Sequence, residues 1–261
     1  MSDAITDSLY GTLADAAERA RWAMTDIPWD RIDRAAVTPQ LCDLVRESAF
    51  AELTTASATR RFLTELGDDT DLVHWISVWF FEETRHPQVL LRWLQQVGIG
   101  VDDDFMRRGR GTASFMKSRM GTFVTNIISE MVASASYGKL AETCGEPVLS
   151  AIAQNLAADE ARHAASFYAF ARRHLERSRD PQAERRDALK IAYAWFHDNS
   201  HVRHPVNEHR VRNGSEMTAE TTVVPRDRIV ETIGTLIGHD MRNTADLIAT
   251  IRGDGGSHEA T

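Results

Sequence analysis

The chain has 261 residues, of which 43% are apolar and 26% are charged, and its formal net charge is −8. This composition is ordinary for a globular protein, and the acidic balance argues against nucleic acid as a partner. No apolar run approaches the ~20 residues that a membrane-spanning helix needs. The two cysteines, Cys42 and Cys144, fit no CxxC or zinc spacing. The first residues lack a basic start and an apolar stretch, so we expect no signal peptide, no membrane association and a cytoplasmic protein.

Apolar residues recur along the chain at the three- and four-residue spacing of α-helices, which predicts an all-α fold. A lead helix is expected over residues 4–25, and the irregular stretch around Pro28 ends it. Thr38-Pro39 is typical of a helix start, because a hydroxyl can cap the helix and proline suits its first turn.

Four longer helices are predicted next, and each carries one acid on an otherwise apolar or small-residue face. Their expected ranges are about 39–67, 70–97, 113–142 and 147–176, with a long crossover over 98–112. Pro87 falls inside the second of them, where we expect a local distortion or, as the alternative, a break. Further helices at about 182–202 and 225–251 complete the expected single domain over residues 1–261.

Two short motifs repeat along these helices. Glu83-Thr84-Arg85-His86 and Glu160-Ala161-Arg162-His163 each place a carboxylate and an imidazole on one helix face. Glu52 lies 31 residues before Glu83, and Glu130 lies 30 residues before Glu160. Four-helix bundles that bind two iron ions take a Glu from each of two helices and a Glu-x-x-His pair from each of the others. The pattern predicts six metal ligands: Glu52, Glu83, His86, Glu130, Glu160 and His163.

Electrostatics supports the presence of cations at this predicted site. Four carboxylates gathered inside a bundle would repel one another, and each would cost several kcal/mol to bury unpaired. Two divalent cations would balance their charge, and a carboxylate-rich set favours two iron ions, with manganese as the alternative metal. Open coordination positions would then let O2 bind and be reduced. Glu82, Asp159, Arg85 and Arg162 are candidates to orient the ligands; the alternative is that they are ordinary polar residues on solvent-facing helix surfaces.

The stretches Glu82–His86 and Asp159–His163 resemble the paired motifs of the ferritin-like di-iron superfamily. They are most similar to the soluble acyl-carrier-protein desaturases, or fatty acid desaturase type 2, and the resemblance covers about residues 40–175. It implies a ferritin-like four-helix bundle, here with additional N- and C-terminal helices, and a non-haem di-iron centre. It also implies O2 as co-substrate, a small-molecule or carrier-bound substrate and a ferredoxin-type electron donor. We expect a homodimer.

Three positions depart from the patterns of this superfamily. Ala133 stands where plant-type desaturases have a threonine that is thought to assist O2 handling, which weakens the case for desaturation itself. Leu90 replaces the tyrosine of ribonucleotide-reductase-like relays, and Leu156 replaces the additional histidine of the N-oxygenase branch.

Other residues could contribute to function but have simpler explanations. Phe123, Phe167 and Phe170 lie in phase with the ligands and could line a substrate pocket, or could equally be bundle core. His197, His201, His204 and His209 crowd one region and could bind metal or line an entrance, although surface histidines are the plainer interpretation. Arg107, Arg108 and Arg110 could dock an acidic partner or simply be solvated. Trp75, Trp79, Trp93 and Trp195 are expected to pack in the core or at a dimer contact, and one of them could carry electrons.

Two functions remain open from the sequence. The first is an O2-activating oxidoreductase that acts on an organic substrate as a desaturase, hydroxylase or N-oxygenase. The second is an iron-binding or ferroxidase-type bundle without an organic substrate. A metal-free helical interaction protein is a third hypothesis, and it would predict no bound metal.

Overall fold

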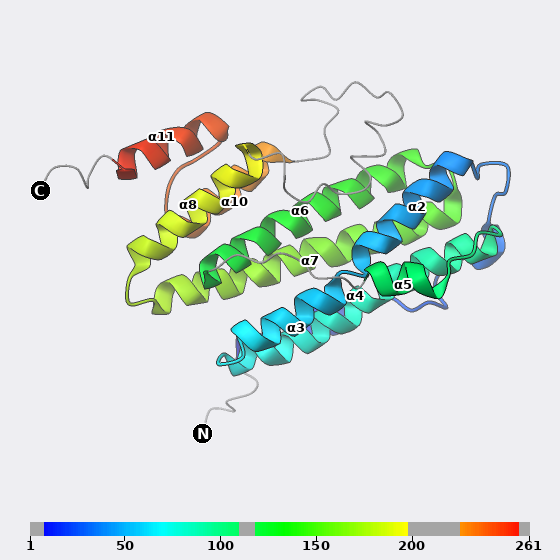
Figure 1. Cartoon of the computed structure of the whole chain (residues 1–261), viewed down its shortest axis with the longest axis horizontal. Helices are drawn as coiled ribbons and strands as arrows, with labels where there is room; N and C mark the ends of the chain where they lie inside the picture. Colours follow the sequence, from blue (N-terminus) through cyan, green and yellow to red (C-terminus); the bar gives the residue numbers. More distant parts are fainter. Residues whose placement is uncertain (1–7, 110–117, 198–224, 256–261) are drawn as a thin grey trace, which may run out of the picture. The chain divides into compact units, whose positions relative to one another are not determined.

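The computed structural model describes residues 8–109, 118–197 and 225–255, and every long regular element in these ranges is an α-helix. Figure 1 shows their arrangement along the chain. The helices are α1 (Leu9–Ala20), α2 (Pro39–Glu52), α3 (Thr55–Glu65), α4 (Thr70–Gln96), α5 (Asp103–Gly109), α6 (Arg119–Thr143), α7 (Pro147–Arg177), α8 (Pro181–His197), α10 (Arg226–Ile237) and α11 (Thr244–Gly255), with a 3₁₀ turn at Trp29–Arg31.

Contacts between residues group the described chain into two compact units. The first holds residues 8–109 and 133–162, and the second holds residues 118–132, 163–197 and 225–255. Whether the chain forms the expected single domain stays a prediction.

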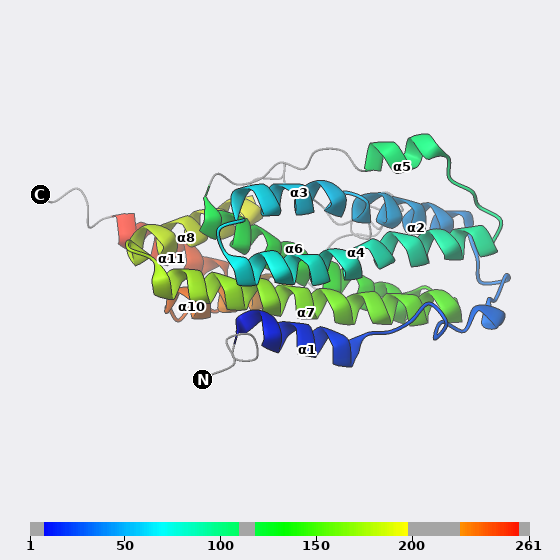
Figure 2. The same ribbon diagram turned by 90° about the horizontal axis from the view of Figure 1, so that it is seen from below.

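In the first unit α4 packs against α1, α2 and α3, and α5 packs on α2. Figure 2 shows α2 and α3 following one another alongside α4. Side-chain caps fix where these helices begin: the Thr38 hydroxyl accepts from the Leu41 N–H at 3.1 Å, and Asp69 accepts from the Leu72 N–H at 3.1 Å. A continuous apolar core, which includes Val45, Leu90 and Trp93, joins α2 and α4 to the end of α6 and the start of α7.

A fully buried acid, Glu146, ties the start of α7 to this core. One of its oxygens accepts from the N–H groups of Asp33 at 3.1 Å and Val148 at 3.2 Å. The other accepts from the Leu149 N–H and the Trp93 indole, both at 2.7 Å. Four donors satisfy one carboxylate, so Glu146 is a structural acid that also complements the helix dipole.

In the second unit α8, α10 and α11 pack on one another. Their contact is apolar, with Leu189, Ile229, Ile233 and Leu247 almost completely buried. The chain reverses after α10 at Gly238, whose φ of 78° is a left-handed conformation that glycine adopts at little cost.

Four helices lie close to their predicted ranges: α4, α6, α7 and α8 correspond to 70–97, 113–142, 147–176 and 182–202. Helix α4 continues through Pro87, so the alternative of a break there is wrong. Helix α1 ends at Ala20, five residues before the predicted end. Residues 4–7, 113–117 and 198–202 of the predicted helices lie outside the described residues.

The predicted helix over 39–67 is wrong as one element, because it divides into α2 and α3 directly after Glu52. The Thr54 N–H bonds the Ala51 carbonyl three residues back at 3.0 Å, and the Thr54 hydroxyl bonds the same carbonyl at 2.7 Å. Such a local bond competes with the hydrogen bonds that would continue the α-helix. The adjacent β-branched residues Thr54 and Thr55 also have a low helix propensity.

Two other predicted elements need correction. The crossover over 98–112 contains α5, which starts where Asp102 accepts from the Phe105 N–H at 2.7 Å. The predicted helix over 225–251 divides into α10 and α11, because Gly238 ends the first and the Asn243 side chain caps the second at 2.9 Å from the Ala245 N–H. None of the described helices is both long enough and apolar enough to span a bilayer.

Candidate metal centre

Four of the six predicted ligands meet inside the first unit. Glu52 ends α2, Glu83 and His86 lie one turn apart on α4, and Glu160 lies on α7. One ligand atom from each lies within 4.8 Å of the corresponding atoms of the other three. The side chains are nearly excluded from solvent, with exposed fractions of 0% for His86 and 10% for Glu52.

The imidazole of His86 lies among three carboxylates. Its Nδ1 is 3.3 Å from an oxygen of Glu160 and 3.8 Å from oxygens of Glu52 and Glu83. Burial alone would lower the pKa of His86, but Glu160 and Glu83, with the hydrogen bond to Asp159, outweigh it and raise the pKa well above its ordinary value. A positive charge is therefore strongly favoured at Nδ1, and either a proton or a metal ion supplies it.

This donor set fits a metal ion of the iron or manganese type. Three carboxylates and one imidazole are oxygen-rich, contain no thiolate, and lie close enough together to share one ion. The two cysteines among the described residues, Cys42 and Cys144, pack in the apolar core. The residues present therefore match the chemistry of the predicted iron or manganese centre.

Asp159 orients His86 from the side opposite the carboxylates. Its Oδ2 is 3.2 Å from His86 Nε2 and accepts from the Trp22 indole at 2.8 Å, while its Oδ1 accepts from Arg162 at 2.7 Å. Burial would raise the pKa of Asp159, but the bonds from His86, Arg162 and Trp22 lower it to about 2. The ionised carboxylate fixes the ring so that Nδ1 faces the acids.

The other candidate supporting residues extend this network. Arg162 also donates to Glu82 at 2.8 Å, and Arg85 donates to the backbone carbonyl of Trp22. The Arg85 guanidinium lies 4.1 Å from the centre of the Trp22 ring. Glu82, Arg85 and Asp159 are all buried. The sequence did not single out Trp22, because its contact with Asp159 spans 137 residues and no local pattern reveals it.

Two hydroxyl groups donate hydrogen bonds to the carboxylates of the centre. Tyr137 on α6 is fully buried and donates its phenol proton to Glu52 Oε1. Burial and the neighbouring Glu52 raise the pKa of Tyr137 well above its usual value, so the phenol remains a donor. Thr55 donates to Glu83 Oε2 at 3.1 Å. Sequence reasoning gave Tyr137 no role at the site.

The remaining predicted ligands, Glu130 and His163, belong to the second unit and are 8% and 1% exposed. Helix geometry alone indicates their direction. His163 follows Glu160 by three residues on the uninterrupted helix α7, and Glu130 precedes Tyr137 by seven residues on α6, so each shares a face with a residue of the centre. Their role as ligands stays a prediction.

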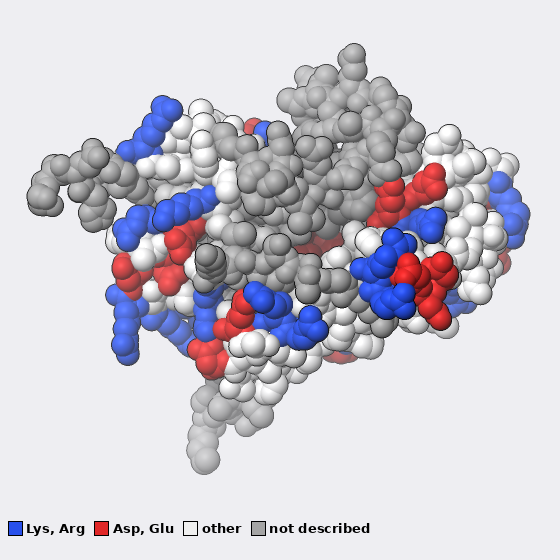
Figure 3. All heavy atoms as spheres, in the orientation of Figure 1, with Lys and Arg blue, Asp and Glu red and all other residues white. Residues whose placement is uncertain are grey.

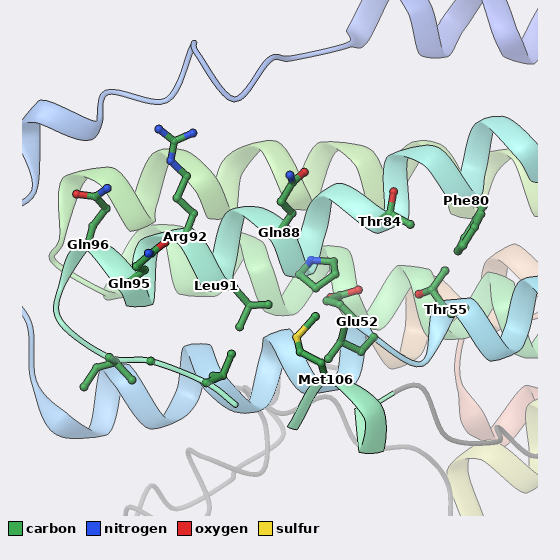
Figure 4. Close-up of a pocket in the computed structure, with 16 residues that line it drawn as sticks. Glu52, Thr55, Phe80, Thr84, Gln88, Leu91, Arg92, Gln95, Gln96 and Met106 are labelled. Carbon is green, nitrogen blue, oxygen red and sulfur yellow. The ribbon is translucent and has the colours of Figure 1, made fainter. Parts of the chain in front are cut away.

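A cavity of about 1070 Å³ reaches this centre within the first unit. Figure 4 shows Glu52 and Leu91, which come from different helices, pointing into the same space. The lining is largely apolar, with glutamine amides along α4. It includes Leu53, Ala56, Phe80, Leu91, Ile99, Met106, Gln88 and Gln95, together with Glu52 and Thr55.

The predicted pocket residues do not line this cavity. Phe123, Phe167 and Phe170 lie in the second unit and are almost completely buried. Phe123 packs near the ring of His174 at 6.0 Å between centroids, and Arg173 lies 4.8 Å from the Phe170 ring. Helical periodicity correctly predicted that the three phenylalanines are buried. It could not show which buried residues line a cavity.

The predicted histidine-rich site lies outside the side chains that the structure describes. His201, His204 and His209 lie outside the described residues, and the side chain of His197 at the end of α8 is likewise not described. The predicted arginine cluster is partly neutralised, because Asp104 pairs with Arg107 and, at 2.7 Å, with Arg108. Figure 3 shows blue and red side chains together over α5. Arg110 lies outside the described residues.

The predicted tryptophans Trp75, Trp79 and Trp93 are core residues with at most 3% exposure. Trp75 and Trp79 stack at 6.4 Å between centroids along α4. Trp195 is only partly buried.

Long helices that carry a buried cluster of carboxylates and an imidazole are typical of the ferritin-like metal-binding bundles. The sequence profile of the fatty acid desaturase type 2 family matches residues 30–190 of the chain, and the chain belongs to this family. The resemblance stated from the paired motifs is confirmed, as is the all-α, ferritin-like fold.

Solved structures with the same fold include R2-like ligand-binding oxidases. A mutant with an aerobically reconstituted Mn/Fe cofactor aligns with a TM-score of 0.61 and 18% identity over 91% of this chain and 95% of its own. Another mutant with an Fe/Fe cofactor has a TM-score of 0.56 and 18% identity over 89% and 92%. The oxidase from Sulfolobus acidocaldarius has a TM-score of 0.52 and 17% identity over 95% and 92%. No curated protein sequence matches the chain.

Proposed function

We propose that the protein is a dimetal oxidase that uses O2 to oxidise a small organic substrate, by desaturation, hydroxylation or N-oxygenation. The observation that carries this proposal is the convergence of Glu52, Glu83, Glu160 and His86, of which Glu52 also lines a large cavity. Membership of the desaturase family supports the same reaction class.

Glu52, Glu83, His86 and Glu160 would hold metal within the first unit. Glu130 and His163 are the two further ligands that the sequence repeat predicts. Two divalent ions balance four carboxylates, which removes the repulsion that such a buried cluster would otherwise suffer. Two iron ions fit this donor set, with manganese at one position as the alternative, since the R2-like oxidases named above carry Fe/Fe or Mn/Fe.

When bound, the metal pair supplies the reduction of O2: removal of two hydrogens or insertion of one oxygen atom each consumes one O2, two external electrons and two protons. The chain's own residues prepare the site for this. Asp159 holds the His86 ring, and the cavity leaves space for a substrate beside Glu52.

The cavity supports an organic substrate over iron storage alone. Its volume is at the upper end of the range for small-molecule sites, and its lining is mainly apolar with a few amide groups, as is typical of such sites. A bundle that only bound or oxidised iron would need no apolar space of this size beside its ligands.

Electrons would come from an external donor of the ferredoxin type. Trp22 supports an entry route, because its indole is hydrogen-bonded to Asp159, which in turn contacts the ligand His86. The exposed Phe81 ring and the cation of Arg21, 4.7 Å from its centre, lie near this position on the surface. We also propose a homodimeric assembly.

The test is O2 consumption by the iron-loaded chain with a chemical reductant and a panel of small organic acids, amines and acyl compounds. We expect at least one compound to accelerate O2 uptake and to yield a product two hydrogens lighter or one oxygen heavier. Glu160→Ala should abolish this, while the exposed Glu142→Ala should not. Oxidation of added Fe(II) without any organic product would contradict the proposal and indicate a ferroxidase.

A further inference from the structure

Tyr137 contacts the candidate centre in a way that no helical motif reveals. Its phenol donates to Glu52 Oε1, while Glu52 Oε2 is the oxygen that lies 3.8 Å from His86 Nδ1. One oxygen of this carboxylate is thus engaged by a neutral donor, and the other faces the imidazole and the remaining acids.

Glu52 also has less backbone support than the other acids of the centre. It is the last residue of α2, and the turn residues Leu53 and Thr54 follow it before α3 begins. Glu83 and Glu160, in contrast, lie in the interior of long helices. Glu52 borders the cavity as well, so a carboxylate released from its position has open space to enter.

We infer that Tyr137 is a positioning residue, which holds Glu52 so that it offers a single oxygen to the ion it shares with His86 and does not turn into the cavity. This inference rests on the proposed function and specifies how one of its ligands is set. A partner that fixes a ligand in this way typically contributes 10- to 100-fold in metal affinity.

The test compares Tyr137→Phe with the wild-type chain in a Co(II) titration followed by visible absorption. Phenylalanine keeps the ring and removes the hydroxyl alone. We expect binding at one of two positions to weaken by about tenfold or more. The absorption per bound Co(II) should also fall, because a released Glu52 can bind through both oxygens and raise the coordination number. Tyr168→Phe on α7, where the residue is only partly buried, makes the same chemical change as a control and should change neither quantity.

Unchanged affinity and spectrum in a folded Tyr137→Phe would overturn the inference. Failure of the wild-type chain to bind Co(II) would instead contradict the proposed function, so the two failures are distinguishable.

If Tyr137→Phe does not fold, fluorotyrosine in the wild-type chain gives the same test. The chain has four tyrosines, and Phe variants at Tyr10, Tyr168 and Tyr193 assign the Tyr137 signal by elimination. We expect the fluorine resonance of Tyr137 to shift on saturation with Zn(II), since the acceptor Glu52 is then metal-bound. A Tyr137 resonance that does not move would overturn the inference.

Discussion

At the scale of single residues, the centre depends on groups that bind no metal themselves. His86 would be poorly oriented without Asp159, because an imidazole can present either nitrogen and rotate about its side-chain bonds. Asp159 in turn stays ionised in a buried place through the donors Trp22 and Arg162. The ligand His86 is thus held by Asp159, and Asp159 is held by a second set of hydrogen bonds from Trp22 and Arg162.

We predict that Asp159→Asn weakens metal binding by 10- to 100-fold while the fold survives, since the amide no longer carries the charge that favours the required tautomer of His86. Isothermal titration with Mn(II) measures this. Asp43→Asn, an exposed change on α2, is the matched control and should leave the affinity as it is. Equal affinities for Asp159→Asn and the wild-type chain would show that Asp159 does not orient the ligand.

The lowered pKa of Asp159 also predicts a pH dependence of stability. The group has a pKa of about 2 when folded, against 3.8 in its reference state. A depressed carboxyl pKa adds stability above the reference value, and this stability disappears as the pH falls through the folded value. The metal-free chain should therefore lose about 2 kcal/mol from this group between about pH 4 and pH 2.

Urea denaturation across that pH range measures the loss. In Asp159→Asn the part of the acid-induced loss of unfolding free energy that comes from Asp159 should be absent. If the unfolding free energy depends on pH in the same way in the two chains, Asp159 is not the source of the loss.

At the scale of helices, caps and local bonds decide where the elements end. The division of α2 from α3 at Glu52 follows from the Thr54 bonds to Ala51, and it places the ligand at a helix end beside the cavity. The start of α7 depends on Glu146, which gathers four donors from three parts of the first unit.

Removal of Glu146 should therefore cost far more than removal of an exposed acid. Glu146→Ala leaves the Trp93 indole and three backbone N–H groups without their acceptor, and we expect a loss of about 3–5 kcal/mol in the free energy of unfolding. Glu142→Ala near the end of α6 should change it by less than about 0.5 kcal/mol. Denaturant unfolding monitored by circular dichroism compares them, and similar values for both would refute the structural role of Glu146.

The turn between α10 and α11 gives a second prediction at this scale. Gly238→Ala introduces a side chain at a φ of 78° and should destabilise the chain by about 1–2 kcal/mol. Gly253→Ala, inside α11 with open space around it, should be neutral or stabilising. Thermal melts of the two variants check the contrast; a more stable Gly238→Ala would mean that the turn does not require glycine.

At the scale of the whole chain, the sequence predicted most long helices because their apolar faces are regular and their starts are marked by Thr38-Pro39 and Asp69. It missed the end of α2 and the separation of α10 from α11, since a threonine bond and a left-handed glycine are single-residue events within otherwise helical patterns. The cavity could not be foreseen, because periodicity tells which residues point inward but not where packing leaves space.

The repeat of spacing between Glu52, Glu83, Glu130 and Glu160 was enough to propose the ligands, because helical register converts spacing into direction. The same register could not identify Trp22, which reaches Asp159 from a segment between helices. It also could not reveal the contact of Tyr137 with Glu52. Both contacts arise from tertiary packing of distant segments, and a single sequence contains no local signal for them.

The most direct test of the account is anomalous diffraction from crystals loaded with Fe(II) or Mn(II) under anaerobic conditions. The account predicts two peaks about 3.5–4 Å apart, one beside Glu52 and His86 and one beside Glu130 and His163. Peaks confined to other parts of the molecule, or no ordered peak near these six side chains, would contradict it.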